Sequence, residues 1–293
     1  MRAEQIAARV WPGRELEIEP LGGGITNHNF VVRVDGKAYV LRIAGADTGL
    51  LGIDRAAEHE AARTAAELGV GPEVVDFVEG SLITCFVEGG IVPIEEIRRP
   101  GCLREVAELL RRIHDGPPFP ARFDAFRVVE TYRATAEAHG VRIPPQYAHA
   151  KARADEIERT LGARPEQPCH NDLLNANFIR SPDGIRIVDW EYAGMGDRFF
   201  DLANFSVNHE LSDHESDVLL EAYFGEVTNE TREHLRLMRF MSDFREAMWS
   251  VVQQGLSTLD VDYVEYATRH FDRLSTTMAD PRFEDWLETS RGI

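Results

Sequence analysis

Apolar and polar positions divide the chain into a first part rich in strand patterns and a longer remainder rich in helix patterns. In the first part, four runs are rich in strand-forming residues, and an Asp-Gly pair separates the first two as in a β-hairpin. These runs are 31–34, 38–43, 74–78 and 82–87. Residues 54–68 are strong helix formers and end at Gly69. We therefore expect a small antiparallel sheet that carries one helix.

The remainder of the chain follows the helical period. Residues 103–114 place apolar side chains on one stripe, and 129–140 and 147–161 continue as helices with one charged face. A Glu-Gly-Gly sequence at 88–90 comes directly after the last predicted strand and has the composition of a hinge. We therefore expect two lobes, with the boundary after residue 88.

Three oxygen-bearing side chains stand out at the centre of the chain. Asp172 is followed five residues later by Asn177, and Asp189 ends the short apolar run 185–188. Transfer of a phosphoryl group from ATP needs a carboxylate that orients the attacking hydroxyl and accepts its proton. It also needs an amide oxygen and a second carboxylate that hold Mg²⁺. Asp172, Asn177 and Asp189 would supply these groups in that order; the alternative is a capped turn followed by an ordinary strand end.

The motif His-Asn-Asp-x4-Asn at 170–177, followed by Val-Asp-Trp-Glu-Tyr at 188–192, resembles the choline/ethanolamine kinase family. That family belongs to the protein-kinase-like small-molecule kinases, with the aminoglycoside phosphotransferases. The resemblance implies an α+β, protein-kinase-like two-lobe fold. A small antiparallel-sheet, nucleotide-binding lobe would span 1–88, and a mostly helical catalytic and acceptor-binding lobe would span 89–293. It also implies ATP and Mg²⁺, and phosphorylation of the hydroxyl of a small cationic amino alcohol, choline or ethanolamine.

A nucleotide site is expected in the first lobe. Three glycines precede the first strand of the hairpin and let backbone N–H groups approach phosphate oxygens, although they could equally form a flexible turn. The resemblance adds a Thr-Asn pair, a strand arginine that binds phosphate, a helical glutamate that pairs with it, and hinge backbone that pairs with adenine. A solvent-facing arginine and a plain edge strand are the ordinary alternatives. The corresponding residues are Gly24, Thr26, Asn27, Arg42, Glu58 (or Glu60), Cys85 and Val87.

The acceptor site is expected on the C-terminal helices. By resemblance, Trp249 and Tyr266 fall where the family encloses an ammonium group between aromatic faces, although they could also pack the helical core. Glu246 replaces the second tryptophan of this cage, and Asn208 replaces an acidic residue, with Glu210 close by. A carboxylate favours a cation with N–H donors over a fully methylated nitrogen. Ethanolamine or another amino alcohol is therefore expected beside choline, and Asp172 would also contact the acceptor.

Three further residues are expected to support the site. The resemblance implies that His170 braces the catalytic loop by packing and hydrogen bonding. Asp201 has the position of a helix N-cap, and the resemblance implies that it braces the same loop. Glu191 would touch the metal shell through water, or it would be a surface glutamate.

The charge balance limits the partners. The formal net charge of −18 argues against nucleic acid and against an anionic membrane surface, and it either favours a cationic substrate or serves solubility. Three cysteines without a metal-like spacing, a polar N-terminal stretch and the lack of a long apolar run predict a reduced, cytoplasmic enzyme without stable membrane association. The expected partner is a small-molecule acceptor, and the sequence leaves both a monomer and a homodimer open.

Two other functions fit parts of the pattern. A kinase of another small molecule, such as an aminoglycoside or thiamine, matches the acidic charge equally well, but the His-Asn-Asp motif and the aromatic helices favour an amino alcohol. A catalytically silent nucleotide-binding module would have no need of the complete set Asp172, Asn177 and Asp189.

Overall fold

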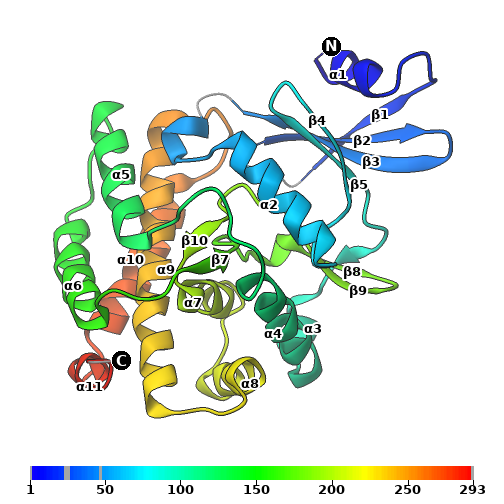
Figure 1. Cartoon of the computed structure of the whole chain (residues 1–293). Helices are drawn as coiled ribbons and strands as arrows, with labels where there is room; N and C mark the ends of the chain where they lie inside the picture. The colour runs from blue at the N-terminus through cyan, green and yellow to red at the C-terminus, as the bar shows by residue number, and fades with distance from the viewer. Residues whose placement is uncertain (1, 23–26, 46–47, 292–293) are drawn as a thin grey trace.

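The computed structural model describes residues 2–22, 27–45 and 48–291 (Figure 1). Gly24 and Thr26 of the predicted phosphate loop lie outside these residues. The first part of the chain forms an antiparallel sheet in the order β1-β2-β3-β5-β4. Its strands are β1 (Glu17–Leu21), β2 (Asn27–Val34), β3 (Lys37–Ala44), β4 (Val74–Val78) and β5 (Ser81–Cys85).

Two helices pack on this sheet. The β2–β3 turn at Asp35-Gly36 has φ values of 51° and 76°, the left-handed conformation that tight hairpins require. Apolar side chains of β2, β3 and β5 pack against α1 (Arg2–Val10) in a small separate core. Helix α2 (Arg55–Glu67) begins after Asp54, whose carboxylate accepts hydrogen bonds from the N–H groups of Ala56 and Ala57. Its alanine-rich face belongs to the main core, so α2 connects the sheet to the helical part.

The helical part is built around one long helix, α9 (Asn229–Leu256), which runs vertically through Figure 1 in yellow and orange. Helices α5, α6, α7, α8, α10 and α11 all contact it. Buried side chains occupy almost every position from Leu237 to Gln253, so α9 is surrounded by protein over its C-terminal half. The other helices are α3 (Ile94–Ile97), α4 (Pro100–His114), α5 (Ala125–Ala138), α6 (Gln146–Leu161), α7 (Arg198–Asn208), α8 (Asp213–Phe224), α10 (Tyr263–Met278) and α11 (Phe283–Thr289).

Two small sheets lie between the five-stranded sheet and the helices. Strand β6 (Gly90–Ile91) pairs with β8 (Phe178–Ser181), which pairs with β9 (Gly184–Ile187). Strand β7 (Gln167–Cys169) pairs with β10 (Gly194–Gly196). Gly89, in the predicted hinge, has φ +140°, and a Cβ there would lie 1.9 Å from the carbonyl oxygen of Arg180. The hinge glycine therefore permits close contact with β8, and the boundary after residue 88 stays a prediction.

Some predicted element ends were wrong. The helix expected to begin at residue 129 begins at Ala125, where Asp124 caps it. Asp201 is not an N-cap: Asp197 caps α7 by accepting from the N–H of Phe199, and Asp201 lies one turn further on. Asp-Arg-Phe-Phe-Asp offers two acidic candidates in the first turn, and sequence alone did not separate them. Within the described residues, no helix has both the length and the apolar character needed to cross a membrane.

Candidate active site

The loop after β7 is held by the carboxylate of Asp201. The backbone N–H groups of His170 and Asn171 donate to its two oxygens over 2.8 and 2.7 Å. His114 Nε2 lies 3.0 Å from the oxygen that His170 contacts. Asn171 has φ +66°, an uncommon conformation that this anchoring stabilises. The loop therefore enters the site with a fixed direction.

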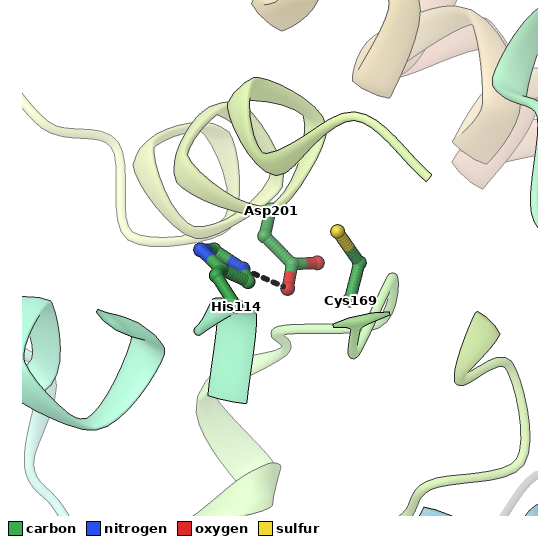
Figure 2. Close-up of side chains that lie close together, drawn as sticks. All are labelled: His114, Cys169 and Asp201. Atoms are coloured by element: carbon green, nitrogen blue, oxygen red, sulfur yellow. Dashed lines mark hydrogen bonds and ion pairs between the residues drawn. The ribbon is translucent and has the colours of Figure 1, made fainter. Parts of the chain in front are cut away.

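His114, Cys169 and Asp201 lie close enough together to resemble a metal site (Figure 2). All three are buried, and the Asp201 oxygens are already occupied by the bonds just described. The other nitrogen of His114 lies 2.6 Å from the hydroxyl of Tyr223. Burial raises the pKa of the Cys169 thiol well above its ordinary value, so this sulfur stays protonated. We interpret the group as the brace of the loop and not as a metal centre.

His170 has the geometry of a supporting residue. One ring nitrogen lies 3.0 Å from the carbonyl oxygen of Val188, and the other accepts from the backbone N–H of Asp172 over 3.2 Å. This pattern requires a neutral imidazole with its proton on Nε2. Burial also lowers the pKa of His170, which favours that neutral form.

Asp172 lies at the end of the braced loop. Its Oδ1 accepts from Nη1 of Arg245 over 3.1 Å, and its backbone carbonyl accepts from Nδ2 of Asn177 over 2.8 Å. Burial raises the pKa of this carboxyl group, and the positive charge of Arg245 opposes the rise. Arg245 is thus a direct cationic partner of Asp172, and the sequence analysis did not identify it.

A cleft of about 320 Å³ lies between the five-stranded sheet and the site loops. Arg42, Asn177 and Asp189 line its polar side. Its apolar walls come from Val40, Leu82, Ile91, Ile179 and Val188, and its rim includes Cys85 and Val87. An apolar cleft with a few charged and polar side chains is the kind of site expected for a nucleotide.

The predicted strand–helix ion pair is present. Arg42 Nη1 lies 2.5 Å from Glu58 and 2.7 Å from Oδ1 of Asp189. Burial acts to lower the pKa of Arg42, but the two carboxylates raise it above the ordinary value, so the guanidinium stays charged. Asp189 has φ +69°. Glu60, the alternative to Glu58, is exposed and pairs with Arg63 instead.

The residue types at the cleft fit Mg²⁺ and a nucleotide. Asn177 donates from its amide nitrogen to the Asp172 carbonyl, which leaves its amide oxygen for a ligand. This oxygen and the carboxylate of Asp189, which lines the same cleft, are ligands of the kind that Mg²⁺ prefers. At the rim, the N–H groups of Cys85 and Phe86 donate to backbone carbonyls. Within the described residues, no such bond occupies the N–H of Val87, so this donor remains for a ligand.

Two of the predicted residues, Asn27 and Glu191, are engaged in contacts within the protein. Asn27 donates to Glu191 over 2.8 Å and accepts from Arg55 over 2.8 Å, so both ends of its side-chain amide are occupied within the protein. Arg55 also lies 3.1 Å from Glu191. Glu191 is buried, and its interpretation as a surface residue was wrong. Burial raises its pKa, and the charges of Arg42 and Arg55 oppose this. Glu191 therefore links the sheet to the loop that carries Asp189.

The predicted acceptor residues lie together on α9 and α10. Glu246 Oε1 lies 2.5 Å from Arg245 Nη1, and its Oε2 accepts from the hydroxyl of Tyr266 over 3.0 Å. The indole N–H of Trp249 donates to the Tyr192 hydroxyl over 3.0 Å. The Trp249 and Tyr266 rings lie 6.1 Å apart in an edge contact. These residues share one cluster beside Asp172, and each is also packed in the core.

Arg42 offers a direct test of the cleft. If Arg42 binds phosphate as the resemblance implies, replacing it by Met should lower kcat/KM for ATP by about 100-fold, because phosphate would lose a positive partner and Glu58 and Asp189 would lose the cation between them. Steady-state kinetics with varied ATP would measure the loss. Arg33→Met, on the neighbouring strand at an exposed position, is the matched control. An unchanged kcat/KM for ATP in Arg42→Met would exclude Arg42 from the nucleotide site.

Comparison with known proteins matches residues 17–238 to the phosphotransferase enzyme family. The crystal structure of a choline/ethanolamine kinase family protein from Mesorhizobium loti is 30% identical, has a TM-score of 0.83 and matches over 99% of each chain. Choline kinase LicA from Streptococcus pneumoniae has a TM-score of 0.80 at 23% identity, over 95% of this chain and 99% of its own. The protein named probable ethanolamine kinase A, from Dictyostelium discoideum, is 25% identical over 90% of this chain and 86% of its own.

These matches confirm the expected fold, a small antiparallel-sheet lobe followed by a mostly helical one. The family match includes the whole five-stranded sheet, the loop of Asp172 and the loop of Asp189. The likeness to the Mesorhizobium protein extends over almost the full chain. The chain therefore belongs to the phosphotransferase enzyme family and, within it, to the choline/ethanolamine kinase family.

Proposed function

We propose that this protein transfers the γ-phosphate of ATP, with Mg²⁺, to the hydroxyl of a small cationic amino alcohol, choline or ethanolamine. The observation that carries the proposal is that Asn177 and Asp189 line an apolar cleft whose rim includes Cys85 and Val87 of the hinge, while Asn177 is hydrogen-bonded to the backbone of Asp172. The names of the relatives support the substrate class, since they are choline and ethanolamine kinases.

The roles follow from the contacts. Adenine would lie between the apolar walls and pair with the backbone at Val87, and Arg42 would meet the phosphates. Asn177 and Asp189 would hold Mg²⁺, which when bound neutralises charge on the transferring phosphate. Glu58 keeps Arg42 in place. Most of the rate enhancement would then come from positioning and charge stabilisation.

Asp172 would act on the acceptor. The acceptor hydroxyl donates a hydrogen bond to the Asp172 carboxylate, and its oxygen attacks the γ-phosphorus. The bond between the γ-phosphorus and the bridging oxygen breaks, ADP leaves, and the hydroxyl proton passes to Asp172. Arg245, in contact with Asp172, favours the ionised carboxylate that this step requires.

The acceptor's charged nitrogen would meet the cluster of Glu246, Trp249 and Tyr266. Tyr266 and Arg245 hold the two carboxylate oxygens of Glu246 in fixed positions. A carboxylate in an aromatic setting binds a nitrogen that carries N–H donors better than one covered by methyl groups. Among amino alcohols, we therefore expect ethanolamine to be used better than choline.

The test is release of ADP from ATP and Mg²⁺ with a panel of acceptors. The panel contains ethanolamine, its methylated derivatives, choline, thiamine and an aminoglycoside, with ATP binding measured in parallel. Turnover with ethanolamine or choline supports the proposal. Turnover only with thiamine or the aminoglycoside would replace the acceptor, and ATP binding without any turnover would favour a silent module.

A further inference from the structure

The side chain of Arg245 occupies the centre of the acceptor cluster. It is 1% exposed, so it lies inside the protein beside Asp172 and not at the surface. Its Nη1 contacts Asp172 at 3.1 Å and Glu246 at 2.5 Å. Its guanidinium carbon lies 4.5 Å from the centre of the Tyr192 ring, on the ring face. Two carboxylates and an aromatic face therefore surround one cation that belongs to the protein.

The same environment is what a quaternary ammonium group requires. Such a group has no N–H donors, so it depends on aromatic faces and nearby negative charge for its binding energy. Here the Tyr192 face is covered by Arg245, and both oxygens of Glu246 are engaged, by Arg245 and by Tyr266. A second cation without N–H donors would meet the positive charge of Arg245, which already covers a face of the Tyr192 ring.

Arg245 is unlike a movable surface arginine. Separating a buried cation from two carboxylates leaves uncompensated charges inside the protein, which is strongly unfavourable. Its Nε and Nη2 atoms have no hydrogen-bond partner within the described residues. An acceptor hydroxyl beside Asp172 would accept a hydrogen bond from one of these donors. Acceptor binding would therefore stabilise the guanidinium in its present position.

We propose that Arg245 is a resident cation of the acceptor site and determines its specificity, excluding quaternary ammonium acceptors and leaving room for amines with N–H donors. This inference rests on the proposed function, because it places the acceptor beside Asp172. A primary ammonium can donate to the carboxylates and does not depend on an aromatic face. Arg245 thus has a larger influence on the choice of acceptor than Glu246 alone.

The first test compares wild type with Arg245→Ala. We would measure kcat/KM for ethanolamine and for choline, and binding of tetramethylammonium by calorimetry without ATP. The variant loses a partner of Asp172, so its absolute rates fall, and the readout is the ratio of the two acceptors. The ratio of kcat/KM for choline to kcat/KM for ethanolamine should rise about tenfold or more, and tetramethylammonium should bind only to the variant.

Arg236→Ala is the matched control. Arg236 is on the same helix, contacts the carboxylates of Glu233 and Asp213, and lies 5.6 Å from the centre of the Trp286 ring, away from the site. It should leave the acceptor ratio unchanged. A double variant, Arg245→Ala with Glu246→Gln, removes both charges of the buried pair. It replaces the single variant in the test if Arg245→Ala does not fold because Glu246 is left buried without its cation.

The outcomes separate the two proposals. If wild type uses ethanolamine but the variants keep its acceptor ratio and do not bind tetramethylammonium, the inference about Arg245 is wrong and the proposed function stands. The inference about Arg245 is also wrong if wild type binds tetramethylammonium, or if it phosphorylates choline with a kcat/KM similar to that for ethanolamine. These two measurements need no folded variant. If wild type phosphorylates no amino alcohol, the proposed function fails, while the tetramethylammonium measurement still tests the resident cation.

Discussion

Replacing Asp172 by Asn should abolish turnover while the protein stays folded. We expect kcat with the preferred amino alcohol to fall by about 1,000-fold or more, because an amide cannot take the hydroxyl proton. The amide keeps the size of the side chain, and its oxygen can still accept from Arg245. The loop anchors on Asp201 are unaffected, since they use the backbone of His170 and Asn171. Kinetics with varied acceptor would measure the loss.

Two further measurements make this result specific. Calorimetry should show ATP binding to Asp172→Asn close to that of wild type, because the expected nucleotide contacts lie on other residues. Asp183→Asn, at an exposed turn between β8 and β9, should keep full activity. If Asp172→Asn retained near-normal kcat, another group would have to accept the proton, and the assigned role of Asp172 would be incorrect.

Residues whose positions follow from local sequence were the most predictable part of the site. Asp172 and Asn177 are five residues apart and share one short loop, so the chain itself brings them together. The alternation before Asp189 indicated a strand end, and β9 ends two residues earlier. Glu58 was expected because the resemblance requires a helical glutamate that pairs with the strand cation, and its spacing from Arg55 favoured it over Glu60; in the structure it contacts Arg42.

Contacts between distant segments were less predictable. Arg245 stands next to Glu246 in the sequence, but nothing local indicates that its side chain reaches Asp172, 73 residues earlier. The hydrogen bonds of the Asn27 side chain to Arg55 and Glu191 likewise depend on how three segments pack. A useful signal was present: Arg and Glu side by side in the apolar C-terminal half of α9 imply a buried ion pair, since isolated buried charges are unfavourable.

Removing the carboxylate of Asp201 should cause the largest loss of stability among single substitutions at the site. Asp201→Ala leaves the N–H groups of His170 and Asn171 without acceptors and takes a partner from His114, all of them buried. A buried polar group that loses its partner costs about 1 to 3 kcal/mol, so three of them predict about 3 to 5 kcal/mol once the loop relaxes. Urea unfolding would measure this loss, with kcat reduced in the remaining folded protein.

Asp197→Ala, on the same helix, is the comparison that separates bracing from capping. Asp197 caps α7 and contacts His234, so its removal should cost about 1 kcal/mol, the usual effect of losing a helix cap. Amide hydrogen exchange at His170 and Asn171 should accelerate in Asp201→Ala and stay slow in Asp197→Ala, because only the first variant removes their acceptor. Equal destabilisation by the two substitutions would mean that Asp201 contributes no more than a helix cap does, and the loop would then need another source of its fixed conformation.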